Sequence, residues 1–224
     1  MKIAGLSGLA FLMDGCGMSL FDQQIFQATE PFNEKFETFL LNPTKLIKEF
    51  SSSQIEPKAL IVNTYDLTPN IDPERFRLII DGAVNKPLTL SISEIKKFPL
   101  TTMIIRHVCV EGWAAIVGWG GVRLSELIAL AQPKPNAQFI NFKSADGYYD
   151  SWDIVSAMHP QTILAYEKNG EPLPIDNGAP LRLASPIKLG YKQSKWVTHI
   201  TLLEEKPKAL GYWEDQGYEW FAGL

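Results

Sequence analysis

Short runs of strand-forming residues, separated by turn-forming residues, fill this chain from about residue 60 onward. Several of them alternate polar and apolar side chains, as a half-buried strand does, and Asn169-Gly170 predicts a tight hairpin turn. The predicted strands are residues 75–80, 88–92, 101–108, 139–143, 163–166 and 196–203. They outnumber the helices and do not alternate regularly with them. The pattern therefore predicts an α+β domain built mainly from mixed sheets.

Helices are expected to be few and short in this region. One is predicted near residues 94–98, and a second places Leu124, Leu127, Ile128 and Ala131 on one apolar face before prolines end it. With 224 residues, 46% of them hydrophobic, the chain can bury one sizeable core. We therefore expect a single globular domain over residues 56–224.

The composition excludes several classes of protein. A formal net charge of -4 argues against a nucleic-acid-binding surface, so we expect no nucleic acid partner. The two cysteines, Cys16 and Cys109, cannot form a disulfide framework. The spacing of Cys and His residues suggests no zinc site.

The first 20 residues are predicted to be a signal-like or membrane-tether segment. Residues 3–13 form an apolar run that is too short to span a bilayer, and the first six residues resemble the tail of a twin-arginine signal whose start lies upstream. Export would place the protein in a bacterial periplasm or on the extracytoplasmic face of a membrane. If the given start is correct and no signal functions, the protein is cytoplasmic. Lipidation of Cys16, in a sequence that resembles a lipoprotein cleavage site, stays open.

Residues 21–55 are predicted to form an amphipathic helical arm and a linker. Thr29 can cap a helix in which Phe32, Phe36, Phe39 and Leu40 recur at helical spacing. We favour an arm that packs on its own domain. The alternative is a docking surface for a membrane partner.

Cys109 is the residue with the clearest chemical potential. It lies in the run Arg106-His107-Val108-Cys109-Val110-Glu111-Gly112-Trp113, after a predicted strand. A lone thiol can be a soft, anionic metal ligand if nearby groups such as Arg106 and His107 lower its pKa. The alternative is a buried cysteine that packs as a small hydrophobic residue.

A second informative segment carries an excess of positive charge. The segment 182–195 contains four fixed cations and no carboxylate, although the whole chain is acidic. These cations are Arg182, Lys188, Lys192 and Lys195. They predict a bound anion such as phosphate, to which Gly190 allows close backbone approach. The alternative is a solvated basic loop.

Together these segments resemble the ordered motifs of the sulfite-oxidase-fold molybdopterin oxidoreductases. The matching segments are residues 106–113, 119–124, 157–160 and 177–182 and Lys195-Trp196, and the resemblance extends over about residues 60–203. It is closest to the bacterial periplasmic branch that includes the catalytic subunit of the methionine-sulfoxide reductase. The resemblance implies a β-rich mixed-sheet sulfite-oxidase-like fold with a molybdenum-molybdopterin cofactor.

The resemblance also implies roles for individual residues. Cys109 matches the cysteine that ligates molybdenum. Strand alternation lets only one of Arg106 and His107 face the metal site, and we favour His107. Cofactor contacts are implied for Asn177, Arg182, Gln193, Ser194 and Lys195, for Ser144, and more loosely for Asn63 and Tyr65.

The implied activity is a two-electron transfer of an oxygen atom to or from a small substrate of the sulfur- or nitrogen-oxide type. No haem domain is evident in the sequence, so electrons are expected to be exchanged with a separate partner, either a membrane cytochrome or a c-type cytochrome. The dimerisation domain of eukaryotic-type sulfite oxidases is missing, which predicts a monomer. The alternative is a non-catalytic pterin-binding or partner subunit that retains the fold.

Aromatic residues near these motifs are expected to be mostly structural. We predict that Trp113, Trp119 and Trp196 pack in the core. The cluster of Tyr148, Tyr149 and Trp152 is expected to form a loop that can line a substrate entrance.

Overall fold

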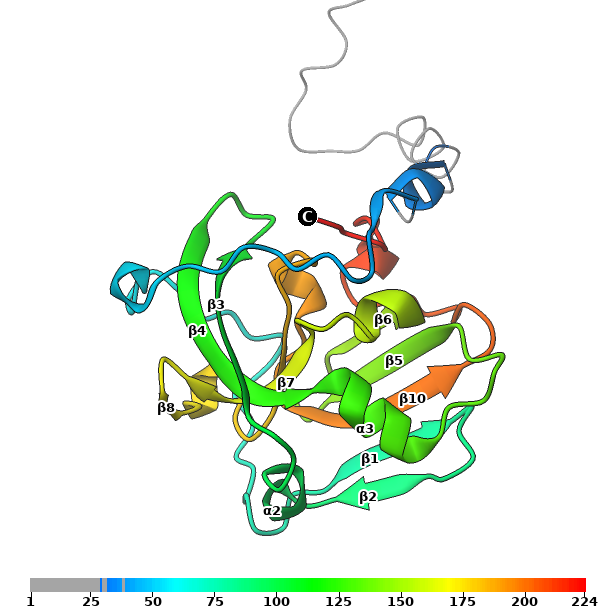
Figure 1. Ribbon diagram of the computed structural model, residues 1–224, viewed down its shortest axis with the longest axis horizontal. Coiled ribbons are helices and arrows are strands. Elements are labelled where there is room, and N and C mark those ends of the chain that lie inside the picture. Colours follow the sequence, from blue (N-terminus) through cyan, green and yellow to red (C-terminus); the bar gives the residue numbers. More distant parts are fainter. Residues whose placement is uncertain (1–28, 30–31, 38) are drawn as a thin grey trace, which may run out of the picture.

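The computed structural model describes residues 29, 32–37 and 39–224, and it consists mainly of two sheets (Figure 1). The first sheet has the order β2-β1-β10-β5-β6, in which β1 and β10 run parallel and the other neighbours antiparallel. Its strands are β1 (Leu78–Gly82), β2 (Leu88–Leu90), β5 (Phe139–Ser144), β6 (Tyr149–Asp153) and β10 (Val197–Leu203). The predicted α+β class with mixed sheets is confirmed.

The second sheet is antiparallel. Its order is β3-β4-β7-β8, and β9 pairs with β7. Its strands are β3 (Thr101–Val108), β4 (Ala114–Arg123), β7 (Ile163–Lys168), β8 (Glu171–Pro172) and β9 (Arg182–Ala184). Asn169 and Gly170, between β7 and β8, both have positive φ, as the predicted hairpin requires.

Short helical elements connect the strands. They are α2 (Ile92–Ile95), α3 (Leu124–Ala131) and α4 (Ile154–Ala157), with 3-10 turns η1 (Ser52–Gln54), η2 (Ile175–Asn177), η3 (Gly190–Lys192) and η4 (Glu214–Gln216). Helix α3 buries the four apolar residues predicted from the sequence, Leu124, Leu127, Ile128 and Ala131. Helix α2 begins with a capping box in which the Ser91 N–H donates to the Glu94 carboxylate and the Glu94 N–H donates to the Ser91 hydroxyl.

The sheets share one core and a smaller second one. The main cluster joins the first sheet to α3 and to the inner faces of β4, β7 and β9. The second cluster covers the other face of β3, β4 and β7, where Leu60 and Leu173 close it. Strand β4 is therefore buried on both faces, and its eight central residues are all buried.

An extended strap, residues 45–56, crosses the outside of the second sheet (Figure 1). Gln161 holds it by accepting a hydrogen bond from the Ile47 N–H and donating one to the Ile47 carbonyl, at 2.8 and 2.9 Å. The Phe50 N–H donates to the Ile104 carbonyl of β3. The strap thereby pairs with the free edge of β3 at Ile104.

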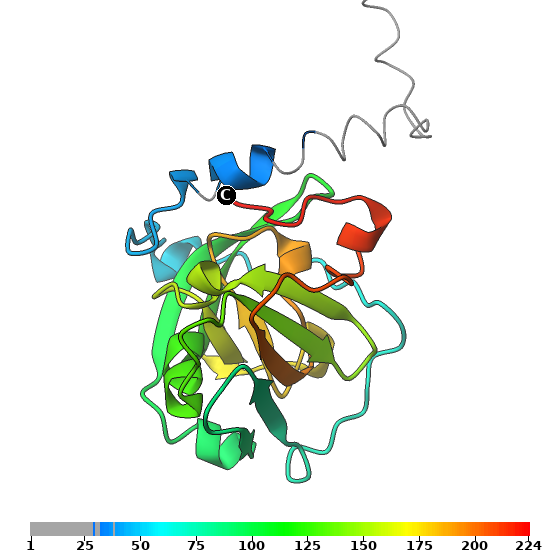
Figure 2. The ribbon, with the colours of Figure 1, turned by 90° about the vertical axis from the view of Figure 1, so that its right-hand side faces the viewer.

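The arm that precedes the strap exposes its apolar residues. Residues 32–37 are helical, yet Phe32 is 71% and Phe39 83% exposed. The expected packing of this aromatic face on the domain is therefore not what the structure shows. The arm does approach the carboxy-terminal end, as Figures 1 and 2 both show, and Lys206 forms an ion pair with Glu34 at 2.6 Å.

The predicted signal-like segment, residues 1–20, and Cys16 lie outside the described residues. In the part of the chain that the structure does describe, no helix has the length and apolar character needed to cross a bilayer.

The close contact between β4 and β7 leaves no room for a side chain at Gly121. The register between the strands shifts at Gly120 and Gly121, and a Cβ on Gly121 would lie 2.6 Å from the Ala165 Cα. We expect Gly121→Ala to lower the free energy of unfolding by about 1–3 kcal/mol, measured by urea denaturation, because rigid backbone cannot make room.

Gly118→Ala is the matched control on the same strand, because its added Cβ would meet its nearest neighbour at 3.4 Å. Equal destabilisation by the two substitutions would show that close approach at Gly121 is not the cause.

Candidate functional site

One cavity brings together the segments that the sequence singled out. Its volume is about 330 Å³, and it is formed where the end of β3, the loop from β9 to β10, the β5–β6 turn and the carboxy-terminal segment meet residues 60–65. The polar, charged and aromatic residues that line it include Asn63, Thr64, Tyr65, His107, Cys109, Glu111, Trp113, Asp146, Tyr148, Asn177, Arg182, Tyr191, Gln193, Ser194, Lys195, Tyr212, Trp213 and Tyr218, and Gly190 also lines it.

Cys109 lies in the cavity wall immediately after β3. Its N–H donates to the Trp113 carbonyl, which closes the turn that ends the strand. The Glu111 carboxylate accepts hydrogen bonds from the Trp113 indole at 2.9 Å and from the Asn63 amide at 3.1 Å, and the Cys109 thiol lies 3.5 Å from it. Trp113, predicted to pack in the core, is partly buried against the second core cluster and also lines the cavity.

The surroundings do not activate the Cys109 thiol by themselves. Burial, assisted by the Glu111 carboxylate, raises the pKa of Cys109 above its usual value. Arg106, expected to supply positive charge, lies on the opposite face of β3, outside the cavity, and stacks on Phe50 of the strap. Strand alternation explains this outcome, because consecutive side chains point to opposite faces. A thiolate at this position therefore needs a bound cation, such as a metal, to stabilise it.

His107 faces the cavity as an uncharged imidazole. It is 5% exposed, and burial, followed by the charge of Arg182, lowers its pKa to about 3. Gln193 donates its amide N–H bonds to the Ser185 and Lys188 carbonyls, so its Oε1 is the acceptor for Nδ1 of His107 at 3.2 Å. His107 Nε2 is then left as an acceptor. Gly190 must be glycine here, because a Cβ would lie 2.7 Å from that nitrogen.

Arg182 is a buried cation with no carboxylate partner. It is 4% exposed and donates to the backbone carbonyls of Asn177, Leu183 and, at 3.4 Å, Gln193, while its guanidinium stacks 4.5 Å from the centre of the Trp119 ring. No salt bridge involves it in the described part of the chain. Burial lowers the pKa of Arg182 to about 9. A charge that is buried and unpaired is costly, so this end of the cavity is built for an anion.

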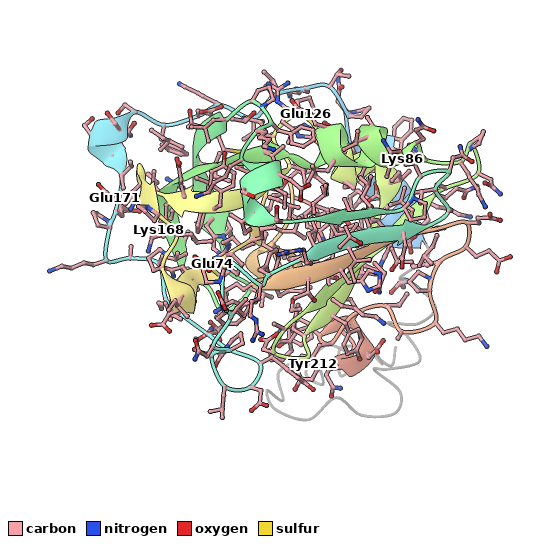
Figure 3. The ribbon with its side chains drawn as sticks, turned by 90° about the horizontal axis from the view of Figure 1, so that it is seen from below. Glu74, Lys86, Glu126, Lys168, Glu171 and Tyr212 are labelled. Carbon is pink, nitrogen blue, oxygen red and sulfur yellow. The ribbon has the colours of Figure 1, made fainter. Side chains whose placement is uncertain are left out.

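Two lysines add to the positive charge near Arg182. Lys195 lines the cavity and donates to the carbonyls of Asn63 and Asp176, and burial, followed by the charge of Arg182, lowers its pKa to about 8. Lys168, labelled in Figure 3 at the end of β7, donates to the Asn177 side chain at 2.9 Å, and its pKa is lowered by the same two causes. Two of the three cations, Arg182 and Lys168, therefore donate to Asn177, and Lys195 donates to its neighbour Asp176.

The other two cations of the basic segment do not serve an anion site. Lys188 pairs with Asp153 at 3.3 Å, and Lys192 pairs with Asp150 and Glu214. The carboxylates that pair with these two lysines lie outside segment 182–195, so the segment alone shows an excess of positive charge. The prediction of a four-cation anion site is thus wrong for Lys188 and Lys192.

Most of the other predicted contact residues line the same cavity. Asn63, Tyr65, Asn177, Gln193 and Ser194 all do. Ser144 does not; it is buried where β5 ends, and the turn that follows contributes Asp146 and Tyr148 instead.

An aromatic wall of the cavity was missed by sequence reasoning. It consists of Tyr65, Tyr148, Tyr191, Tyr212, Trp213 and Tyr218, of which only Tyr65 and Tyr148 were singled out. Tyr149 and Trp152, predicted with Tyr148, belong to β6 and do not line the cavity. The only signal in the sequence was the density of aromatic residues after residue 211.

Comparison with known proteins identifies the family of this chain. Residues 65–213 match the family described as the oxidoreductase molybdopterin binding domain. The chain belongs to this family. The match includes the cavity residues from Tyr65 to Trp213, so the resemblance recognised in the sequence is confirmed.

Similar proteins include two methionine-sulfoxide reductase subunits. A protein of Azospira oryzae, provisionally named protein-methionine-sulfoxide reductase subunit YedZ1, is 35% identical over all of this chain and 84% of its own length. The protein-methionine-sulfoxide reductase catalytic subunit MsrP of Campylobacter jejuni is 32% identical over 91% of this chain and 75% of its own length.

A solved structure supports the fold. The sulfane dehydrogenase SoxCD of Paracoccus pantotrophus superimposes with a TM-score of 0.59 and 21% identity, covering 91% of this chain and 57% of that chain. The predicted fold is thereby confirmed.

The residues in the cavity fit the cofactor that this family's description implies. The Ser194 hydroxyl is buried in the cavity wall and has no hydrogen-bond partner in the described residues, and Arg182 has no counter-anion. Among the described residues, no three His, Cys, Asp or Glu side chains cluster to hold a metal ion. A soft metal at Cys109 would thus take its remaining ligands from a non-protein group.

The positive charges of Arg182 and Lys195 predict that the cofactor-free protein binds anions in a pH-dependent way. Sulfate keeps its charge above neutral pH, whereas Lys195 and Arg182, with pKa values of about 8 and 9, lose protons. We expect sulfate affinity, measured by isothermal titration calorimetry, to fall about tenfold or more between pH 7 and 9.5.

The Lys195→Gln variant should bind sulfate more weakly at pH 7, and its affinity should depend less on pH. Lys208 is exposed, so Lys208→Gln is the control and should follow the wild type. Affinity that is constant or rises with pH would contradict this assignment.

Proposed function

We propose that this chain is the catalytic subunit of a molybdenum-dependent reductase, which removes oxygen from sulfoxides and receives electrons from a separate protein. The observation that carries the proposal is the buried, unpaired Arg182 in the same cavity as Cys109. The same cavity supplies a soft ligand, Cys109, and positive charge, from Arg182 and Lys195. A cofactor with a metal at one end and a phosphate at the other requires both.

Each cavity residue has a defined task in this proposal. Cys109 is the protein ligand to molybdenum, and Arg182, Lys195 and Asn177 hold the phosphate. The Gln193 amide orients His107, whose Nε2 offers an acceptor, and the Ser194 hydroxyl is free to bond the pterin. When bound, the cofactor supplies a two-electron redox change coupled to the movement of one oxygen atom.

The character of the cavity wall favours a neutral substrate. Arg182 and Lys195 are assigned to the phosphate, Arg106 lies outside, and seven of the remaining lining residues are Tyr or Trp. Aromatic rings make favourable contacts with sulfur groups, whereas an oxyanion would need a cation beside Cys109. We infer that the substrate is a sulfoxide such as oxidised methionine, the group named for both sequence relatives. Its reduction uses two electrons and two protons and yields a thioether and water.

The electron partner and the location follow from the same proposal. We propose a membrane or c-type cytochrome as the donor, because the two electrons of each turnover must come from another protein. The apolar run at residues 3–13 supports export to the periplasm. The alternative of a non-catalytic subunit is not favoured, because one relative is itself named as a catalytic subunit.

Loss of the Cys109 sulfur tests the metal site. In enzyme purified from a host that makes the cofactor, Cys109→Ala should lower dye-coupled sulfoxide turnover at least about 100-fold, because the metal loses its protein ligand. Arg182→Met should instead lower the content of pterin itself, measured by fluorescence after its release. The molybdenum content per chain of each variant is measured by mass spectrometry.

Arg106→Met is the control, because Arg106 lies outside the cavity. We expect its turnover to stay within about threefold of the wild type. Wild-type turnover by Cys109→Ala would refute the catalytic assignment.

A substrate panel tests the proposed specificity. With a dye as electron donor or acceptor, we expect kcat/KM for a peptide containing methionine sulfoxide to exceed that for sulfite by about 100-fold or more. The physical reason is that the two cations lining the cavity, Arg182 and Lys195, are assigned to the phosphate of the cofactor and are not left for an oxyanion. A preference for sulfite or nitrate would contradict the proposal.

A further inference from the structure

The carboxy-terminal segment, residues 211–218, supplies three residues of the aromatic wall. Tyr212 lies 4.6 Å from Tyr65, and Trp213 lies 5.1 Å from both Tyr212 and Tyr218, between ring centres. Tyr218 in turn contacts Tyr191 at 5.7 Å. The rings form a continuous row from residue 65 to residue 191, and Figure 3 labels Tyr212 on this segment. The shape of this wall therefore depends on where the segment lies.

Glu214, in the middle of the segment, points the other way, into the body of the domain. Its carboxylate contacts the Lys192 ammonium, which also binds Asp150 at 2.5 Å and the Ser151 carbonyl at 3.0 Å. The side chains of all three members of this Glu214-Lys192-Asp150 triad are 0% exposed. The triad thus joins three distant parts of the chain: η4, η3 and β6.

Other contacts of the segment are weaker or lie at its ends. The Tyr149 hydroxyl donates to Asp215 at 2.7 Å, but in an exposed position where water competes. Gly211 packs directly on the triad, because a Cβ there would lie 2.6 Å from the Glu214 carboxyl carbon. The triad is the only described salt bridge that ties the segment to the body.

The charges of the triad do not cancel when both acids are ionised. Two carboxylates then face one ammonium, and the Glu214 Oε2 has no hydrogen-bond partner among the described residues. Burial, followed by the charge of Asp150, raises the pKa of Glu214 to about 8, against the opposing effect of Lys192. The other titratable groups that face it are Tyr148, Tyr149 and Tyr191, which are neutral acids and add no positive charge.

We propose that Glu214 and Lys192 are positioning residues, which fasten segment 211–218 to the domain and so place Tyr212, Trp213 and Tyr218 as one wall of the substrate cavity. The substrate role of that wall rests on the proposed function. The fastening itself rests on the contacts of the triad alone.

The direction of the pH dependence follows from the charges. The folded segment binds the proton of Glu214 more tightly than an opened segment, in which the ordinary pKa is 4.5. Its stability contribution is therefore complete below about pH 4.5 and is lost as pH rises through about 8. Glu214→Gln keeps the shape and remains neutral, so it should hold the segment at every pH.

Hydrogen exchange tests the fastening without any cofactor chemistry. The amides of Asp215, Gln216, Gly217 and Tyr218 are hydrogen-bonded within the segment. In the holoenzyme, we expect their protection, corrected for intrinsic exchange, to fall at least about tenfold from pH 6 to pH 9. Glu214→Gln should show no such fall. Glu214→Ala should be at least about tenfold less protected at pH 6, with an unchanged circular dichroism spectrum.

Exposed Glu205→Gln is the matched control and should follow the wild type. The same pH dependence in Glu214→Gln as in the wild type would overturn the proposal, as would full protection in Glu214→Ala. A kinetic measurement gives the link to substrate: KM for a methionine-sulfoxide peptide should rise between pH 7 and 9 relative to Glu214→Gln, while kcat stays similar. If no sulfoxide is reduced, the proposed function fails, but the exchange data still decide the fastening.

Discussion

The unpaired charge of Arg182 is the constraint on which the site depends. A guanidinium that is almost fully buried and has no carboxylate partner is tolerated only if backbone carbonyls, an aromatic face or a bound anion compensate for its lost hydration. Here three carbonyls and the Trp119 ring give partial compensation. The positive charge of Arg182 that stays uncompensated is available to an anion in the cavity, and Lys168 and Lys195 add to this charge. The position of Cys109 gains chemical meaning because it lies in the wall of that same cavity.

The fold divides the cations of one short segment between two tasks. Lys188 and Lys192 are satisfied by Asp153, Asp150 and Glu214, so they stabilise the domain and hold the carboxy-terminal residues. Arg182 and Lys195 have no such partners. Because Lys188 and Lys192 are paired with carboxylates of the chain, they need no ligand. Arg182 and Lys195 keep unpaired charge at the cavity, and an anion bound there would stabilise the fold by an amount that grows with the logarithm of its affinity.

Sequence patterns predicted the elements whose packing is local. Strand β3 and helix α3 have regular periodicity because one face of each packs on the core, and both were predicted within a residue or two. Strand β4 was missed because it is buried on both faces and rich in glycine, so it has no alternation. Strand β6 was missed because its polar residues, Asp150 and Ser151, are buried only through contacts with Lys192 and the carboxy-terminal segment. Such long-range partners leave no periodic signal in the sequence.

The same distinction explains which site residues were predictable. Strand alternation indicated that only one of Arg106 and His107 faces the site; we favoured His107, and the structure places only His107 in the cavity. Most of the residues predicted to contact the cofactor came from recognisable motifs. The aromatic wall did not, because its six residues come from four separate segments and meet only in the folded chain. The triad of Glu214, Lys192 and Asp150 belongs to this second kind. In the triad, Lys192 of the basic segment pairs with two carboxylates and links the core to the cavity wall. Part of the positive charge that the sequence suggested for ligand binding therefore sets the shape of the site.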